Sequence, residues 1–326
     1  MNDWRRALSW CSARGRAHFL LTVLTVALLT GACCALVLLP RGAGADTARP
    51  VAGEVVGSRS TDPRVAEVER IMAPFGAVEV RTAADGGLVL AHPGLAEAAA
   101  TLAAELPAAT AAVTDLWGPD WSREAVVVAA ANPSEFAALL RAPDLLPAEV
   151  AAASVADPFR PGTRPTGQRV VFAPDAGTRL SPAELRTLLR HELTHVAARA
   201  QTVDGAPQWM LEGFAEYAAH RGLGSSFAAI APTVLAAAQR GDLPADLPAD
   251  AAFTGAGAVL AYEQAWTVSA FVADSYGEDR LVRLYRAVAA GRLDTAGEDR
   301  VLREVLGTDR TAFVARWREW VADRAR

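Results

Sequence analysis

Residues 191–195 read His-Glu-Leu-Thr-His, and a second stretch, 209–217, reads Trp-Met-Leu-Glu-Gly-Phe-Ala-Glu-Tyr. On a helix, His191 and His195 lie one turn apart on the same face, so both imidazoles can bind one zinc ion. Glu192 then lies beside that face, where its carboxylate can act as a general base towards water. Because a catalytic zinc takes three protein ligands, a third ligand is needed, and Glu212 in the second stretch is the best candidate.

The residues before the histidine pair predict that it lies in the middle of a helix. Ser181 suits the N-cap, Pro182 the first helical position and Glu184 the third. Apolar residues then recur at helical spacing, namely Leu185, Leu188, Leu189, Val196 and Ala197. The chain has only 5 histidines. The pair therefore favours a metal site over a solvated helix face that carries two histidines.

The second stretch also predicts a helix, which begins after the break at 204–207 and stops at Gly222. Glu212 and Glu216 lie one turn apart on this helix. Two carboxylates would normally mark a solvated face. Bulky apolar neighbours surround them here: Trp209, Met210, Phe214 and Tyr217. Carboxylates in such surroundings need a partner, and a cation is the obvious one.

Together the two stretches resemble the gluzincin zinc peptidases. The resemblance is closest to short bacterial peptidase-MA-like domains, and more distant to thermolysin and the aminopeptidase/leukotriene-hydrolase group. It implies that His191, His195 and Glu212 bind Zn²⁺ and that Glu192 is the base. It also implies that Glu216 holds the other ring nitrogen of His191, although thermolysin-like enzymes have aspartate at that position. The metzincin pattern does not fit, because its glycine and third histidine are replaced by an alanine and a glutamine.

Residues 262–265 read Tyr-Glu-Gln-Ala at the start of a long apolar segment. Aminopeptidases of this clan have a similar Tyr-Glu-Lys-Gly stretch, and the resemblance implies that Tyr262 donates a hydrogen bond to the oxyanion. The alternative is that Tyr262 packs in the core, where its hydroxyl needs only some partner. The amine-recognition motif of those enzymes, Gly-x-Met-Glu-Asn, does not occur upstream. We therefore expect an endopeptidase rather than an aminopeptidase.

The N-terminus predicts a membrane location. Residues 19–39 contain no charged side chain and are long enough for one helical span of about 30 Å. Arginines precede this segment, which predicts a cytoplasmic N-terminus and a catalytic domain outside the cell membrane. The competing interpretation is a signal peptide that is cleaved before Asp46, which would give a secreted protein.

Composition excludes several kinds of site and partner. All three cysteines, at 11, 33 and 34, precede the predicted exported part, so that part has no disulfide and no thiolate ligand. A closed structural zinc site, which often uses cysteine, is thereby disfavoured. The net charge is -5 without a clustered basic excess, so we expect no nucleic-acid partner. The expected partners are a peptide or protein substrate and the membrane, while the oligomeric state stays open.

The predicted organisation has four parts. These are a basic cytoplasmic segment (1–18), a transmembrane anchor or uncleaved signal (19–39), a stalk (40–62) and one peptidase domain (63–326). We expect an α+β fold for this domain. Residues 63–180 would form a small mixed sheet with helices and 181–326 a mainly helical part. As the resemblance to thermolysin implies, the zinc site would lie in the cleft between them.

Local patterns place the individual elements. Strands are expected at 78–82 and 88–91, as a hairpin, and at 125–131 and 169–173. The last of these would border the cleft and pair with extended substrate, as in the gluzincins, or would be an ordinary sheet strand. Helices are expected at 65–74, 95–116, 133–141, 227–239, 257–276, 279–290, 298–306 and 310–323.

The predicted function is zinc-dependent hydrolysis of peptide bonds by metal-activated water. The alternative is a membrane-tethered module that keeps zinc and binds peptides without turnover. Glu192 is present, and its loss would normally create such a module, so the enzyme is the favoured interpretation.

Overall fold

The computed structural model describes residues 62–144, 146–160 and 162–326. The predicted cytoplasmic segment and membrane anchor, together with nearly all of the predicted stalk, lie outside the described residues. Among the residues that are described, no helix is both long enough and apolar enough to cross a membrane.

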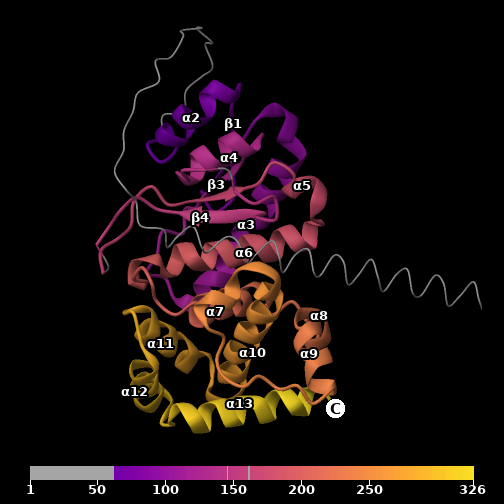
Figure 1. Ribbon diagram of the computed structural model, residues 1–326. Helices are drawn as coiled ribbons and strands as arrows, with labels where there is room; N and C mark the ends of the chain where they lie inside the picture. The colour runs from indigo at the N-terminus through magenta and orange to yellow at the C-terminus, as the bar shows by residue number, and fades with distance from the viewer. Residues whose placement is uncertain (1–61, 145, 161) are drawn as a thin grey trace, which may run out of the picture.

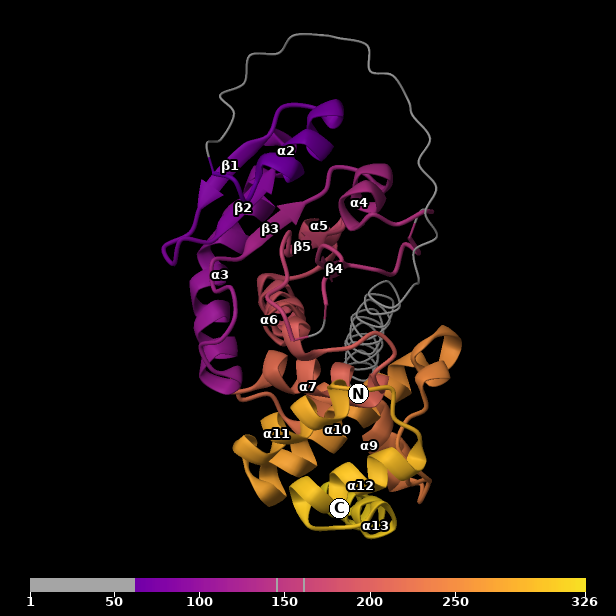
Figure 2. The same ribbon diagram turned by 90° about the vertical axis from the view of Figure 1, so that its left-hand side faces the viewer.

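The described chain has the predicted α+β architecture (Figures 1 and 2). The N-terminal half combines a five-stranded sheet with helices. Its elements are α2 (Ala66–Met72), β1 (Glu79–Thr82), β2 (Leu88–Ala91), α3 (Ala96–Trp117), β3 (Val126–Ala129), α4 (Pro133–Leu140), β4 (Ala152–Val155), β5 (Arg169–Phe172) and α5 (Ala176–Arg179). The remaining helices are α6 (Pro182–Ala198), α7 (Gln208–His220), α8 (Phe227–Ile230), α9 (Pro232–Gln239), α10 (Ala258–Tyr276), α11 (Glu278–Ala289), α12 (Thr295–Leu306) and α13 (Arg310–Arg324).

The sheet is mixed, with the strand order β1-β2-β3-β5-β4. β1 and β2 form the predicted antiparallel hairpin, β2, β3 and β5 run parallel, and β4 is antiparallel to β5. The expectation that the strand at 169–173 borders the cleft is wrong, because β5 lies between β3 and β4. The edge strand that packs on α6 is β4, which was not predicted. Its sequence, Ala-Ala-Ser-Val, has a single β-branched residue and so a weak strand signal.

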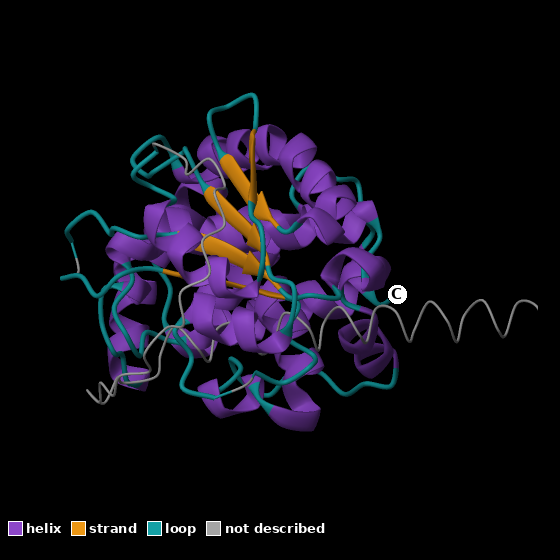
Figure 3. Ribbon diagram, turned by 90° about the horizontal axis from the view of Figure 1, so that it is seen from above, coloured by secondary structure: helices purple, strands orange, loops and turns teal. Residues whose placement is uncertain are grey.

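Helices cover both faces of the sheet, and the strands fan out between them in Figure 3. Alternate residues of each strand enter two different cores, as the two-residue period of a strand requires. In β2, Val89 and Ala91 join the core that includes α3 and α6, whereas Leu88 and Leu90 join the one that includes α2 and α4. The first core continues into the C-terminal helices, so α6 links the sheet to the helical half.

Helix α6 begins as predicted. The Ser181 side chain accepts a hydrogen bond from the Glu184 backbone N–H, and the Glu184 carboxylate accepts one from the Ser181 N–H. Pro182 occupies the first turn, where its missing N–H costs nothing. This start sets the register of the whole helix and therefore the face on which both histidines lie.

Helix α7 runs between α6 and α10 and is held against its neighbours by specific contacts. A β-carbon at Gly213 would overlap the backbone carbonyl group of Ala265, so glycine is what allows α7 and α10 to approach this closely. The indole of Trp209 donates a 2.8 Å hydrogen bond to Glu298 on α12. These contacts fix the position of Glu212, which lies between the two residues in the sequence.

Candidate active site

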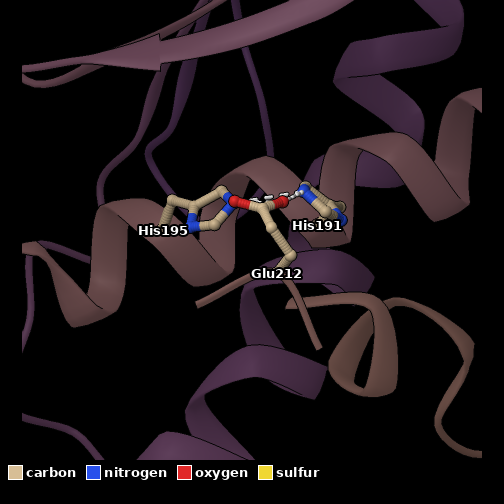
Figure 4. A group of neighbouring side chains, drawn as sticks. All are labelled: His191, His195 and Glu212. Atoms are coloured by element: carbon tan, nitrogen blue, oxygen red, sulfur yellow. Dashed lines mark hydrogen bonds and ion pairs between the residues drawn. The ribbon is translucent and has the colours of Figure 1, made fainter. Parts of the chain in front are cut away.

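Helices α6 and α7 bring His191, His195 and Glu212 together, with one possible ligand atom from each lying within 4.8 Å of the others (Figure 4). The Nε2 atoms of the two histidines are 3.1 Å apart, and Glu212 Oε2 lies 3.5 Å from that of His191 and 3.8 Å from that of His195. Tetrahedral ligands with zinc bonds of 2.0–2.1 Å lie about 3.3 Å from one another. The three donor atoms therefore have the spacing that a shared zinc ion requires.

Burial of the acidic groups also fits a cation. Glu212 is 0% exposed, and neither of its carboxylate oxygens has a hydrogen-bond partner among the described residues. Burial alone would raise the pKa of Glu212, but the imidazole of His195, together with His191, lowers it to about 2. A buried carboxylate held in its charged form needs a positive partner, and zinc would supply it.

His191 lies between two carboxylates. It is 1% exposed, and its Nδ1 lies 3.5 Å from Oε1 of Glu216, on the ring edge that faces away from Glu212. Burial would lower the pKa of His191, but the carboxylates of Glu212 and Glu216 raise it well above its ordinary value. The cluster therefore attracts positive charge strongly.

Glu192 lies beside the three clustered residues and is itself 0% exposed. Both of its carboxylate oxygens lack a hydrogen-bond partner among the described side chains and backbone groups. A buried acid without a protein partner is costly unless it serves a ligand or a water molecule. Its position next to His191 on α6 is that of an acid able to exchange a proton with water at the cluster.

Glu216 connects the cluster to His220, which lies one turn further along α7. Oε2 of Glu216 is 3.6 Å from Nε2 of His220, while Oε1 faces His191. Burial lowers the pKa of His220, so this imidazole tends to be neutral. Glu216 therefore faces Nδ1 of His191, whereas Glu212 lies near Nε2 of the same ring.

Tyr262 and Glu263, on α10, lie in a different part of the site from the three clustered residues. Both line a cavity of about 330 Å³ that Glu216 and His220 also border. Tyr262 is 2% exposed and its ring packs edge-on against that of Phe253. Tyr262 thus packs its ring in the core and also lines the cavity that Glu216 borders.

Glu263 is a site residue to which the sequence analysis assigned no role. It is 4% exposed; one carboxylate oxygen accepts a 2.8 Å hydrogen bond from the Val234 N–H, and Oε1 has no partner. The only signal in the sequence was an acidic residue at the head of an apolar helix. A glutamate is normally expected at the solvated surface. Here the packing of α9 on α10 buries it.

Comparison with known proteins supports the assignment of this region. A family model described as the Peptidase MA superfamily matches residues 181–323. The match begins at the N-cap of α6 and ends in α13, so it includes both helices that carry the clustered residues. No curated protein shows a significant match to the chain. The predicted resemblance to this group of peptidases is thus confirmed over these residues.

Proposed function

We propose that the chain is a zinc-dependent peptidase of the gluzincin type, with His191, His195 and Glu212 as the zinc ligands. The observation that carries this proposal is the spacing of three buried donor atoms beside a buried acid that has no protein partner. The Peptidase MA superfamily match over the same helices supports it. Zinc, when bound, supplies Lewis-acid activation of the water and of the scissile carbonyl.

The residues of the chain carry the proton transfers. Glu192 accepts a proton from the attacking water and passes it to the nitrogen of the leaving amine. Glu216 holds the ring of His191 in the tautomer that leaves Nε2 free for the ion. Tyr262 donates a hydrogen bond to the carbonyl oxygen as negative charge develops there.

An extended peptide suits the edge of the sheet. β4 is one of the two terminal strands of the sheet, and it packs on α6, the helix that carries both histidines. An extended substrate can add to such an edge through backbone hydrogen bonds, which gives affinity without sequence preference. This arrangement favours an endopeptidase.

The test of the function is Glu192→Gln. The change conserves shape but removes the proton acceptor, so we expect zinc content and melting temperature to stay at the parent values. Hydrolysis of a mixed peptide library should fall by about 10²–10⁴-fold or more. Equal turnover by the two proteins would remove Glu192 from the mechanism. A zinc-loaded parent that cleaves no peptide would favour the binding module without turnover.

We also propose that residues 19–39 anchor the protein in the cell membrane with the peptidase domain outside. The support is the uncharged segment and the arginines that precede it. Membrane fractionation with N-terminal sequencing tests this. A soluble product that begins at Asp46 would show that the segment is a cleaved signal.

A further inference from the structure

The cavity beside the proposed zinc site is lined by more acidic than basic side chains. On α6 its lining includes Thr187, one turn before His191, and on α10 it includes Glu263. One helical turn rises about 5.4 Å, so the cavity starts within one side chain's reach of the first histidine. A residue next to the scissile bond could therefore place its side chain here.

The charges around the cavity are mostly negative. Glu184, Glu216 and Glu263 all line it. The one arginine in the lining, Arg186, is bound by both carboxylate oxygens of Glu105, at 2.6 and 2.7 Å, so its charge is compensated outside the cavity. Glu216 lies beside the imidazoles of His191 and His220, whereas Oε1 of Glu263 has no hydrogen-bond partner, and a bound cation would supply one.

The walls suit the stem of a long basic side chain. Trp266, Tyr262, Leu223 and Ile230 supply apolar and aromatic surface. Lysine and arginine place their methylene groups along such surface and keep the charged end at a polar group. Aromatic faces attract the charged end as well.

Glu263 is a buried acidic residue of this lining. Its Oε1 has no hydrogen-bond partner, although the residue is 4% exposed. Burial, with a contribution from the Glu216 carboxylate, raises the pKa of Glu263 to about 7, and the hydrogen bonds from Val234 and Thr233 do not offset this. A cation beside Oε1 would restore the charged form. The Val234 N–H in the first turn of α9 donates to the other oxygen, Oε2.

We propose that this cavity receives a lysine or arginine side chain of the substrate beside the cleaved bond, and that Glu263 accepts its charged end. The inference rests on the proposed peptidase function and names the substrate class of that site. The same chemistry would also suit a free α-amino group, so the experiment must separate the two sources.

The test uses pairs of N-acetylated peptides that differ only beside the scissile bond, with lysine in one and norleucine in the other, on either side of the bond. Norleucine has the carbon stem of lysine without its charge. We expect kcat/KM for lysine to exceed that for norleucine by tenfold or more on one side. A ratio near one on both sides would overturn the inference. If kcat/KM increases only when the N-terminus of the peptide is left free, the cavity binds an α-amino group instead.

Variants assign the preference to the cavity. Glu263→Gln should bring the lysine-to-norleucine ratio close to one, while Glu304→Gln, on the exposed face of α12, should leave the ratio unchanged. Thr187→Lys should also lower the ratio, because it places an ammonium group in the cavity, and Thr187→Met is its uncharged control. A purely structural Glu263 would lower the melting temperature of Glu263→Gln without changing the ratio, and that result would refute the proposal.

A binding measurement tests the preference for lysine separately from the peptidase function on which it rests. Fluorescence anisotropy with Glu192→Gln protein measures the affinity for the same labelled peptides without turnover, and lysine should again be favoured by about tenfold. Tighter binding of the lysine peptide by a chain that hydrolyses nothing would overturn the peptidase function alone. Hydrolysis without any preference for lysine would overturn the role of Glu263 alone.

Discussion

Glu212→Gln removes one negative charge from the proposed zinc ligands and keeps their shape. The carboxylate is fully buried, with its Oε2 3.5 and 3.8 Å from the two histidine Nε2 atoms. Four-ligand zinc sites bind with about 10–16 kcal/mol in total, so one ligand contributes about 3 kcal/mol. An amide oxygen is a poor substitute for a carboxylate, and we expect the Kd for zinc to rise by about 10²–10³-fold.

Two assays measure this loss. Competition with a chelator gives the Kd directly. Thermal or chemical unfolding in buffered zinc gives the stabilisation by bound metal, which is about 4 kcal/mol when free zinc is 1,000 times the Kd. At the same concentration of free zinc, a Kd that is 10²–10³-fold higher reduces this stabilisation to about 0.4–1.4 kcal/mol.

Two control variants show whether the loss of zinc affinity is specific to Glu212. Glu216→Gln leaves all three ligands in place and disturbs only the orientation of His191, so its loss should be smaller, about 10–100-fold. Glu304→Gln, which is exposed, should bind zinc like the parent. Parent-like affinity in Glu212→Gln would refute the assignment of the third ligand. If Glu216→Gln lost more zinc affinity than Glu212→Gln, Glu216 would be the third ligand and Glu212 the acid that orients His191.

Three further predictions concern α7 and α10. Tyr262→Phe should lower kcat by about 10²-fold with little change in melting temperature, the usual cost of losing one oxyanion donor; unchanged kinetics with a lower melting temperature would return it to a packing role. Gly213→Ala should destabilise the fold by about 1–3 kcal/mol in denaturant unfolding, because its methyl group would overlap Ala265. Gly94→Ala, where a β-carbon meets nothing within 4 Å, is the control. The pKa of Glu263 is raised to about 7 from 4.5, so its contribution to stability is complete below about pH 4.5 and is lost as pH rises through 7. Between pH 5 and 8 the parent should therefore lose about 3 kcal/mol of unfolding free energy relative to Glu263→Gln, and parallel pH profiles would contradict this.

Local signals explain what could be predicted from the sequence. The start of α6 is determined locally, because Ser181 and Glu184 form a capping box and Pro182 occupies the first turn. The spacing of the histidines on that helix then predicts which residues meet. The hairpin of β1 and β2 follows from an alternating run at 78–82 and an apolar run at 88–91, separated by Asp85-Gly86-Gly87.

Features that depend on packing could not be predicted in the same way. β4 has a weak strand signal and forms because β5 offers it a partner and α6 covers it. The strand order places β5 inside the sheet, and no local pattern determines that order. Burial of Glu263 depends on α9 packing on α10, which a reading of single segments does not reveal.

The proposed zinc site arises from residues spaced four apart on α6 and on α7, and α10 lines the cavity beside it. Thr187, His191 and His195 recur at that spacing on α6, and Glu212 and Glu216 do so on α7, so the two stripes meet where the helices pack. The positions of the proposed zinc ligands are therefore determined by the register of two helices. Helix α10 contributes Tyr262, Glu263 and Trp266 to the lining of the cavity and provides no proposed zinc ligand. Substitutions on α10 can consequently change which side chain the cavity accepts while the ligands stay in place, and substrate preference can vary independently of metal binding.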